Sequence, residues 1–333
     1  MKRIVIDISI FSIVLFMLIC LSDCKKTENP IKYPLGTFPD TVINLSDINS
    51  AYDDYNAALF ELYGNIQIVF SSNRGSSGGQ FDLEQGIISV VFDQTNGNFG
   101  LGSEVTDDPF LANLFLQAIT TGNDFGPYRF FSSLDGFEYL LLSSTSGEGD
   151  LDFYYLKHLP SFSSSIPSIE GPFPASLLNT SYDDAYICFD TNKDTVYFSS
   201  NRDGNFEVFM HSRPSESNID TWLNLEYASS VKVDSINSTD NDKCPFILRN
   251  VMVFASDRPG GIGGYDLYYS SFRNGKWSSP VNFGPDINTT SDEYRPVIGS
   301  HQDFTNNFMI YSSNRAGGKG GYDLYFTGVE FPD

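Results

Sequence analysis

The chain has 333 residues, in which 42 acidic side chains outnumber 20 basic ones and give a formal charge of −22. A surface this acidic argues against nucleic acid as a partner, because nucleic-acid binding depends on cationic contacts to phosphate. It suits a soluble domain, a cation ligand or a basic partner. Aromatic residues make up 15% of the chain, and long helical periodicities are nearly absent, which favours an all-β fold of many short strands.

The first 23 residues are typical of a lipoprotein signal peptide. A basic start (MKR) precedes an apolar run that ends at Leu21–Cys24, and cleavage there would make Cys24 the lipidated first residue. Asp23 departs from the small residue usual before the cysteine, so an uncleaved membrane anchor is the alternative. Residues 24–38 are polar and contain two prolines, and we expect them to be a tether between lipid and domain.

A strand, a glycine-rich turn and a second strand recur five times after the tether. The copies are Val69–Leu83, Leu141–Tyr155, Tyr197–Met210, Val253–Tyr269 and Tyr311–Tyr325. Their equivalent positions, which lie 72, 56, 56 and 57 residues apart, are Asn73, Thr145, Asn201, Asp257 and Asn314. This spacing fits a four-stranded propeller blade with its loops.

Further strands complete each blade. An acidic pair and a short strand precede each copy, and a fourth strand follows, most clearly in Gly275–Asn288. The sequence ends after the third strand of the last repeat, whereas Thr41–Asn49 resembles a fourth strand. We therefore predict a five-bladed β-propeller of four-stranded antiparallel blades over residues 39–333, in which the N-terminal strand completes the last blade and removes the open sheet edges.

A helix accounts for the one long interval between repeats. In Asp107–Thr120, Asp108 is placed to cap a helix and Pro109 suits its first turn. The apolar residues that fall on one face are Phe110, Leu111, Leu114, Phe115 and Ala118. We predict a short helical insertion near residues 108–120, and the surplus is too short for a sixth blade.

The repeats resemble a known family. The segment FSSNRDGNFEVFM (residues 198–210) has the form S-x-R-x-G-x-x-x-[IV]-[YF] of the WD-repeat-like β-propeller repeats of the TolB type. The copies with RPGGIGGYDLYYS and NGKWSSPVNFGPDIN are similar to repeats of envelope lipoproteins. The resemblance covers roughly residues 36–333 and implies a propeller, but it leaves function open because propellers host many activities.

Each glycine hairpin carries an arginine and an acid. The expected pairs are Arg74 with Asp82, Arg202 with Glu207, Arg258 with Asp266, and Arg315 with Asp323. The second blade has Ser146 in place of the arginine. Repetition in nearly every blade predicts a structural role, a guanidinium that bridges strand ends or adjacent blades; ligand contact is the alternative.

A second recurring feature is an acidic pair before the first strand of each blade. Its second members are Asp54, Asp124, Asp184, Asp242 and Glu293. First strands line the channel of a propeller, so these residues are candidates for an electronegative rim that attracts a cation such as Ca²⁺ or a basic partner. The alternative is that the acids accept hydrogen bonds from turn amides and recur for folding reasons.

Metal and redox signatures are missing. Cys188 and Cys244 form no CxxC motif, and the three histidines show no ligand spacing, so we expect no metal centre and no cofactor apart from Ca²⁺ at the rim. The two cysteines are expected to be buried free thiols, with a disulfide between neighbouring repeats as the alternative.

The function predicted from these patterns is binding without catalysis. No G-x-S-x-G motif occurs, and the acids repeat blade by blade, whereas an active site needs unlike residues in unlike roles. We expect a lipoprotein of the outer membrane, held there by its lipid alone, that binds an envelope protein, or a glycan or peptide. The alternative is a glycan-binding or glycan-cleaving propeller that uses channel carboxylates.

Overall fold

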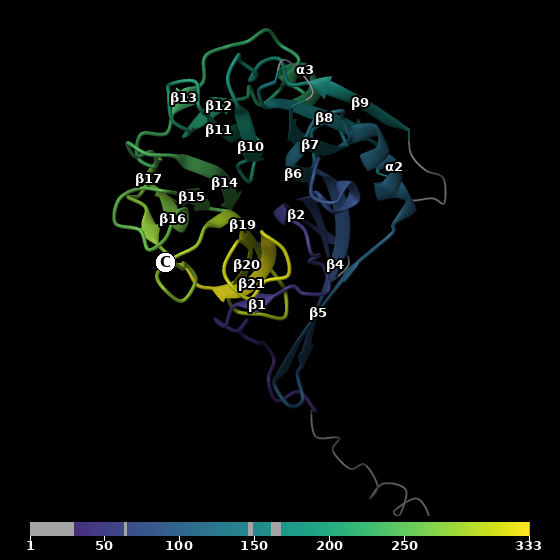
Figure 1. The fold of residues 1–333 in the computed structure, drawn as a ribbon, viewed down its shortest axis with the longest axis vertical. Coiled ribbons are helices and arrows are strands. Elements are labelled where there is room, and N and C mark those ends of the chain that lie inside the picture. Colours follow the sequence, from purple (N-terminus) through teal and green to yellow (C-terminus); the bar gives the residue numbers. More distant parts are fainter. Residues whose placement is uncertain (1–29, 63–64, 146–148, 161–167, 333) are drawn as a thin grey trace, which may run out of the picture.

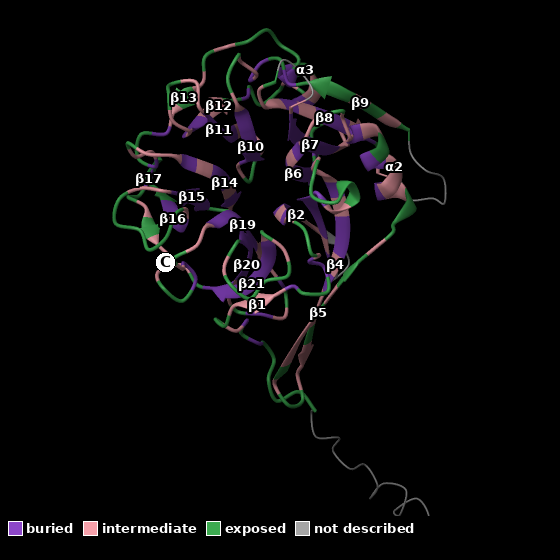
Figure 2. Ribbon diagram, viewed as in Figure 1, coloured by how far each residue is buried: buried purple, intermediate pink, exposed green. Residues whose placement is uncertain are grey.

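Five antiparallel sheets surround a central axis in the computed structural model of the protein, which describes residues 30–62, 65–145, 149–160 and 168–332 (Figure 1). The first strand of each sheet lies next to the axis, and the later strands lie progressively further out. The innermost strands are largely buried (Figure 2). The predicted all-β, five-bladed propeller of four-stranded antiparallel blades is confirmed.

The first three blades follow one another along the chain. The first contains β2 (Asp54–Leu62), β3 (Asn65–Ser72), the short 3-10 helix η1 (Arg74–Ser76), β4 (Asp82–Asp93) and β5 (Asn98–Val105). The second contains β6 (Asp124–Phe131), β7 (Glu138–Ser144), β8 (Asp152–His158) and β9 (Ile169–Pro174). The third contains β10 (Asp184–Phe189), β11 (Thr195–Ser200), β12 (Glu207–Ser212), α3 (Ile219–Leu223) and β13 (Val231–Lys232).

The last two blades complete the ring. The fourth contains β14 (Asp242–Leu248), β15 (Val251–Ser256) and β16 (Asp266–Arg273), and β16 pairs with both β17 (Lys276–Trp277) and β18 (Val281–Asn282). The fifth contains β19 (Glu293–Ser300), β20 (Asn307–Ser313), β21 (Asp323–Val329) and, from the start of the domain, β1 (Ile43–Asn44).

The N-terminal strand closes the ring, as predicted. In the β1–β21 pair, Ile43 lies opposite Phe326. Just upstream, Phe38 is buried and stacks on Phe304 with ring centroids 3.8 Å apart, and Gly36 forms a bridge with Phe304. The last residues of the expected tether therefore pack on the propeller, because their aromatic side chain has a hydrophobic site there.

The helix α2 (Pro109–Ala118) fills the space between the first two blades. The Asp108 carboxylate accepts a hydrogen bond from Leu111 N, and Leu111, Leu114, Phe115 and Ala118 are buried. This buried face packs against residues of β3, β7 and β8. In the part of the chain that the structure describes, no helix has the length and apolarity needed to span a membrane.

Every first strand carries a bulge near its beginning. The register between the first and second strands shifts at the same place in all five blades. The first residue within each shift has a positive φ, between 47° and 62°; these residues are Asn56, Gly126, Tyr186, Cys244 and Arg295. Since a bulge re-aims the chain locally, these five equivalent positions form a ring on the innermost strands, and they are occupied by five different residue types.

Candidate functional site in the central channel

The arginines of the glycine hairpins pair with acids other than those expected. The ion pairs are Arg74–Asp54, Arg202–Asp184 and Arg258–Asp242, each at 2.5 Å, and Arg315–Glu293 at 3.0 Å. The predicted pairs of Arg74 with Asp82, Arg202 with Glu207, Arg258 with Asp266, and Arg315 with Asp323 are not among the ion pairs of the described residues. The hairpin arginines and the second acids of the acidic pairs, which the sequence suggests as two separate sets, therefore form the same ion pairs.

A carbonyl of the preceding chain segment decides this pairing. Arg258 Nη2 donates both to Asp242 and to Ile236 O at 2.7 Å, and Nε donates to Ser256 Oγ. The equivalent carbonyls for the other arginines are Ile48 O, Leu178 O and Ile287 O. Each guanidinium thus ties a first strand to the segment that leads out of the previous blade, which is a structural role.

The acids expected to pair with arginine organise turns instead. Asp266 accepts hydrogen bonds from Ile262 N and Gly263 N, and Asp323 accepts from Lys319 N and Gly320 N in the equivalent turn. Asp82 accepts from the Gln80 amide, and Glu207 forms an ion pair with Lys232. Asp266 and Asp323 thus hold their glycine-rich loops in shape, and Glu207 links β12 to β13.

The predicted electronegative rim is not formed by the predicted residues. Asp54, Asp124, Asp184, Asp242 and Glu293 are each 0% exposed. Four of them are neutralised by arginine. Asp124 has no arginine partner, since its blade has Ser146 at the arginine position, and Ser146 lies outside the described residues. Thr120 donates hydrogen bonds to the Asp124 carboxylate, and burial raises the pKa of Asp124 to about 6. Among the described residues, no group of three or more His, Cys, Asp or Glu side chains is arranged to hold a metal ion.

The first members of the acidic pairs link neighbouring blades. Their side chains accept a hydrogen bond from an amide of the glycine hairpin in the preceding blade, at 2.8–3.0 Å in every case. The donor–acceptor pairs are Phe81–Asn123, Leu151–Asp183, Phe206–Asn241, Tyr265–Asp292 and Tyr322–Asp53. Unlike the second members, Asp53, Asp183 and Asp292 are only half-buried, so their carboxylates reach the surface.

A cavity of about 300 Å³ opens at this end of the channel. Residues from the first, third, fourth and fifth blades line it: Asp53, Tyr55, Phe81, Tyr186, Tyr265, Asp292, Tyr294 and Tyr322. Two carboxylates are thus set among six aromatic rings. This composition suits a sugar, whose C–H faces pack on aromatic rings while its hydroxyls bond to carboxylates.

Tyr322 lies between the two carboxylates. Its backbone N–H donates to Asp53 Oδ1 at 2.8 Å, and its hydroxyl donates to Asp292 Oδ2 at 3.0 Å. Burial, followed by the negative charge of Asp292, raises the pKa of Tyr322. The phenol therefore remains a hydrogen-bond donor at neutral pH.

The aromatic walls are held by ring contacts. Tyr55 stacks on Tyr322 at 5.6 Å and meets Phe81 edge-on at 5.0 Å, and Tyr265 meets Tyr294 edge-on at 5.2 Å. Such pairs fix ring orientation as well as adding contact energy. The cavity is therefore shaped before any ligand arrives, which lowers the ordering cost of binding.

Sequence reasoning missed most of this cavity. The signal was present as unlike residues at equivalent repeat positions: the residue after the second acid is Tyr55, Phe125, Ala185, Lys243 or Tyr294 in the five blades. The cavity therefore combines repeated positions that also join the blades, such as Asp53 and Asp292, with positions that differ between blades, such as Tyr55 and Tyr294.

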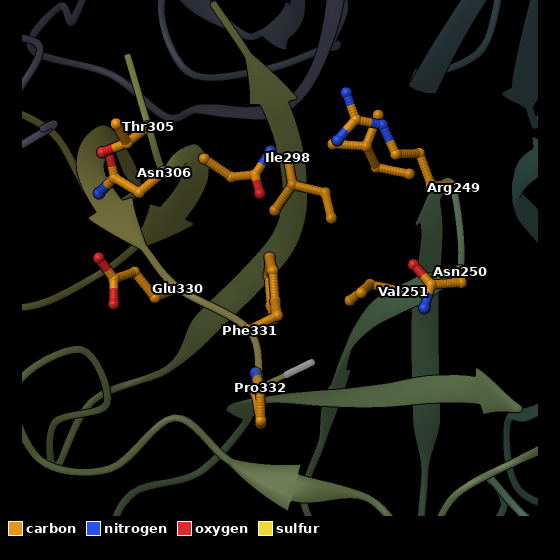
Figure 3. A pocket seen from close by; sticks show the side chains of 11 residues that line it. Arg249, Asn250, Val251, Ile298, Thr305, Asn306, Glu330, Phe331 and Pro332 are labelled. Atoms are coloured by element: carbon orange, nitrogen blue, oxygen red, sulfur yellow. The ribbon is translucent and has the colours of Figure 1, made fainter. Parts of the chain in front are cut away.

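Another cavity, of about 370 Å³, lies at the opposite ends of the fourth and fifth blades' inner strands. Figure 3 shows Ile298 and Phe331 near its centre, Arg249 and Asn250 on one side, and Asn306 on the other. It contains one carboxylate, Glu330, and one aromatic ring, Phe331. The channel cavity is the better candidate because it combines paired carboxylates with several aromatic rings.

Several predictions fall outside the described residues or stay untested. The signal peptide and Cys24 lie in the part of the chain that the structure leaves undescribed, so lipidation, the outer-membrane location and the envelope partner stay predictions. Cys188 and Cys244 are buried free thiols, and burial raises the pKa of each to about 12.

Comparisons with known proteins place the fold among glycoside hydrolases. No protein-family model and no curated protein matches the sequence. A thermostable family-43 glycoside hydrolase has a TM-score of 0.55 at 12% identity, over 86% of this chain and 92% of its own. An endo-arabinase from Bacteroides thetaiotaomicron has a TM-score of 0.53 at 11% identity, over 89% and 99%. The catalytic domain of the Coprinopsis cinerea GH62 α-L-arabinofuranosidase has a TM-score of 0.51 at 12% identity, over 88% and 98%.

These neighbours overturn the prediction of a non-catalytic protein. At 11–12% identity they show the fold alone, but that fold is one in which glycosidic bonds are hydrolysed. The physical ground for the prediction also fails, because four of the second acids are buried in structural ion pairs, whereas the first acids Asp53 and Asp292 line a cavity formed by unlike blades. The resemblance to TolB-type repeats stays a prediction from the sequence motif.

Proposed function

We propose that the protein binds a glycan in the channel cavity and hydrolyses one of its glycosidic bonds. The observation that carries the proposal is the placement of Asp53 and Asp292 at the two ends of Tyr322, within a cavity walled by aromatic rings. The likeness of the fold to glycoside hydrolases supports it.

Two carboxylates are the catalytic groups that most glycoside hydrolases use. One protonates the leaving oxygen, and the other activates water or attacks the anomeric carbon. Asp292 accepts three hydrogen bonds, from Tyr265 N, Asn314 Nδ2 and the Tyr322 hydroxyl. Asp53 accepts two, from Tyr322 N and Asn73 Nδ2. We assign Asp292 as the base, because it accepts the larger number of hydrogen bonds and these favour its charged form, and we assign Asp53 as the acid.

The reaction then needs only these groups and water. Asp53 gives its proton to the glycosidic oxygen as the bond to the anomeric carbon breaks. Water attacks the anomeric carbon while Asp292 takes the proton that the water loses. The products are a free hydroxyl on one sugar and a hemiacetal on the other, and proton exchange with solvent restores both carboxyl groups.

The aromatic walls provide the binding contacts. A sugar that enters between the Tyr55–Tyr322 stack and the Tyr265–Tyr294 pair exchanges water for contacts with flat ring faces. The phenol hydroxyls that line the cavity then donate to sugar oxygens, which fixes the ring relative to the carboxylates.

The repeats supply a matched test. Reducing-end release from a glycan panel that includes arabinan is measured for the wild type and for Asp53→Asn, Asp292→Asn and Asp183→Asn. We expect activity to fall by about 10²-fold or more in the first two, since acid–base groups contribute about 10²–10⁴-fold. Asp183→Asn should keep full activity, because Asp183 makes the same bond between blades, to Leu151 N, without lining the cavity.

Two results would count against the proposal. If the wild type neither cleaves nor binds any glycan of the panel, the cavity has another role. If Asp183→Asn loses as much activity as Asp53→Asn, the loss reflects altered packing at this repeat position and not catalysis. Melting temperatures of the three variants report that structural contribution separately.

A further inference from the structure

Arg295 crosses the channel next to the cavity. It occupies the bulge of β19 at a φ of 47° and is 0% exposed. Its Nη2 donates to Pro127 O, in the first strand of the second blade, at 3.2 Å. Its guanidinium also lies 5.6 Å from the centre of the Tyr186 ring, in the first strand of the third blade. A side chain that touches the innermost strands of two other blades lies inside the channel.

The charge of Arg295 has no counterpart among the described residues. Its Nε and Nη1 are buried and form no hydrogen bond, and no described carboxylate forms an ion pair with it. The other deeply buried arginines differ: Arg129 pairs with Glu138, and Arg213 pairs with Asp194. Because arginine stays protonated in proteins and a buried unpaired charge is costly, the channel needs a negative charge beside Arg295.

A second polar group lies at the same level of the channel. Asn56 occupies the equivalent bulge of β2 and is 0% exposed, and both polar atoms of its amide lack a hydrogen bond of normal geometry. Burial raises the pKa of Tyr186, while Arg295 and Asn56 act on the same phenol in the opposite direction. Arg295, Asn56 and Tyr186 therefore converge on one region.

We propose that this region binds a small monovalent anion, such as chloride or formate, through the free N–H groups of Arg295 and the amide of Asn56. One negative charge neutralises the guanidinium, whereas a divalent anion would leave an uncompensated charge in a buried site. Arg295 is fully buried and lies against the Tyr186 ring, so a small anion that sheds its hydration readily suits the site better than a bulky oxyanion. Neither Arg295 nor Asn56 lines the cavity, although Tyr186 borders both regions, and the inference does not depend on the proposed hydrolase activity.

The test compares anions at constant ionic strength. Melting temperature is measured in sodium chloride, bromide or formate against sodium gluconate, for the wild type, Arg295→Gln, Asn56→Gly and Arg249→Gln. Binding to the folded state alone raises stability with ligand concentration, so we expect a saturable rise in the wild type. Arg295→Gln should abolish the rise, and Asn56→Gly, whose glycine accepts the positive φ, should weaken it.

Arg249→Gln controls for screening at the surface, because Arg249 is exposed; this variant should respond as the wild type does. An equal melting temperature of the wild type in all these salts would overturn the proposal, as would loss of the response in Arg249→Gln. If Arg295→Gln does not fold, anomalous scattering from a bromide-soaked crystal of the wild type decides. Bromide in contact with Arg295 supports the site, and its absence from the channel rejects it.

Discussion

At the scale of single residues, an ion pair between an arginine and a carboxylate has the same structural role in four of the five blades. The arginine of the glycine hairpin neutralises a fully buried carboxylate and also donates to a carbonyl of the preceding segment. A buried ion pair adds little net stability by itself, but removing one partner leaves the other charge uncompensated. The residues of these pairs are therefore sensitive to mutation without being functional.

Arg258→Ala tests this point. We expect it to lower the free energy of unfolding by about 3–5 kcal/mol, since it leaves the Asp242 carboxylate buried without its partner. Urea denaturation measures the change. The double variant Arg258→Ala/Asp242→Asn should recover part of the loss, because it removes the stranded charge as well. A loss in Arg258→Ala no larger than that of the exposed Arg249→Ala would contradict the structural assignment.

Asp124 is the exception among the buried acids and predicts a dependence on pH. Burial raises its pKa from 3.8 to about 6, so between these values the folded state binds more protons than the unfolded state. Stability contributed by the protonated form is therefore lost as pH rises through this window. Asp124→Asn carries no charge and should not show this loss.

The expected size follows from the shift of about two pKa units. Relative to the wild type, Asp124→Asn should gain about 2–3 kcal/mol in unfolding free energy between about pH 3.5 and about pH 7.5. Urea denaturation at several pH values measures it. A difference between the two proteins that stays constant across this range would show that Asp124 does not titrate in the way its burial implies.

At the scale of elements, asparagine side chains hold the short fourth strands in place. Asn49 accepts from Leu324 N at 2.8 Å and donates to Leu324 O at 2.9 Å. The same two-bond contact joins Asn179 to Phe153, Asn237 to Val208 and Asn288 to Leu267. Because β1, β13 and β18 each have only two residues, these side chains extend the pairing where the backbone ladder stops.

Asn49→Ala tests the closure of the ring. The substitution leaves the buried N–H and C=O of Leu324 without their partner, which costs about 1–3 kcal/mol for each unsatisfied group. We expect hydrogen–deuterium exchange to accelerate in β21, the strand to which β1 is attached. Asn237→Ala removes the same contact within the third blade and should accelerate exchange in β12 instead. Similar exchange of β21 in both variants would mean that Asn49 has no special part in closure.

At the scale of the whole molecule, repeated and unrepeated residues have different places. Residues that recur in the blades form the bonds within and between blades, as in the ring of contacts from Phe81–Asn123 to Tyr322–Asp53. Residues that differ between blades, such as Tyr55, Tyr186 and Tyr294, complete the cavity beside members of that ring. The proposed activity belongs to this scale, since Asp53→Asn and Asp183→Asn change equivalent positions, at which asparagine can keep the bond between blades as Asn123 and Asn241 do, and differ in whether the cavity loses a carboxylate.

Much of the architecture could be predicted because its causes are local. The glycine hairpins recur at a spacing that suits four strands. The segment Thr41–Asn49 has the pattern of a fourth strand and precedes the first repeat, so it is available to complete the last blade. The arginine partners could not be predicted, because Asp54 and Asp82 both lie next to Ser72 in the register of the first blade. The choice depends on Ile48 O, which reaches Arg74 only once the ring is closed.

The sequence by itself determined the repeat unit, the number of blades and the strand that closes them, because strand pairing and turn formation depend on neighbouring residues. Only the tertiary structure decided which residues share the cavity. Asp53, Tyr186 and Tyr322 come from the first, third and fifth blades and meet only at the axis. Likewise, Arg295 is buried without an ion-pair partner among the described residues only because the innermost strands surround it. The physical reason is closure, which brings distant positions together at the axis and buries Arg295 between the innermost strands.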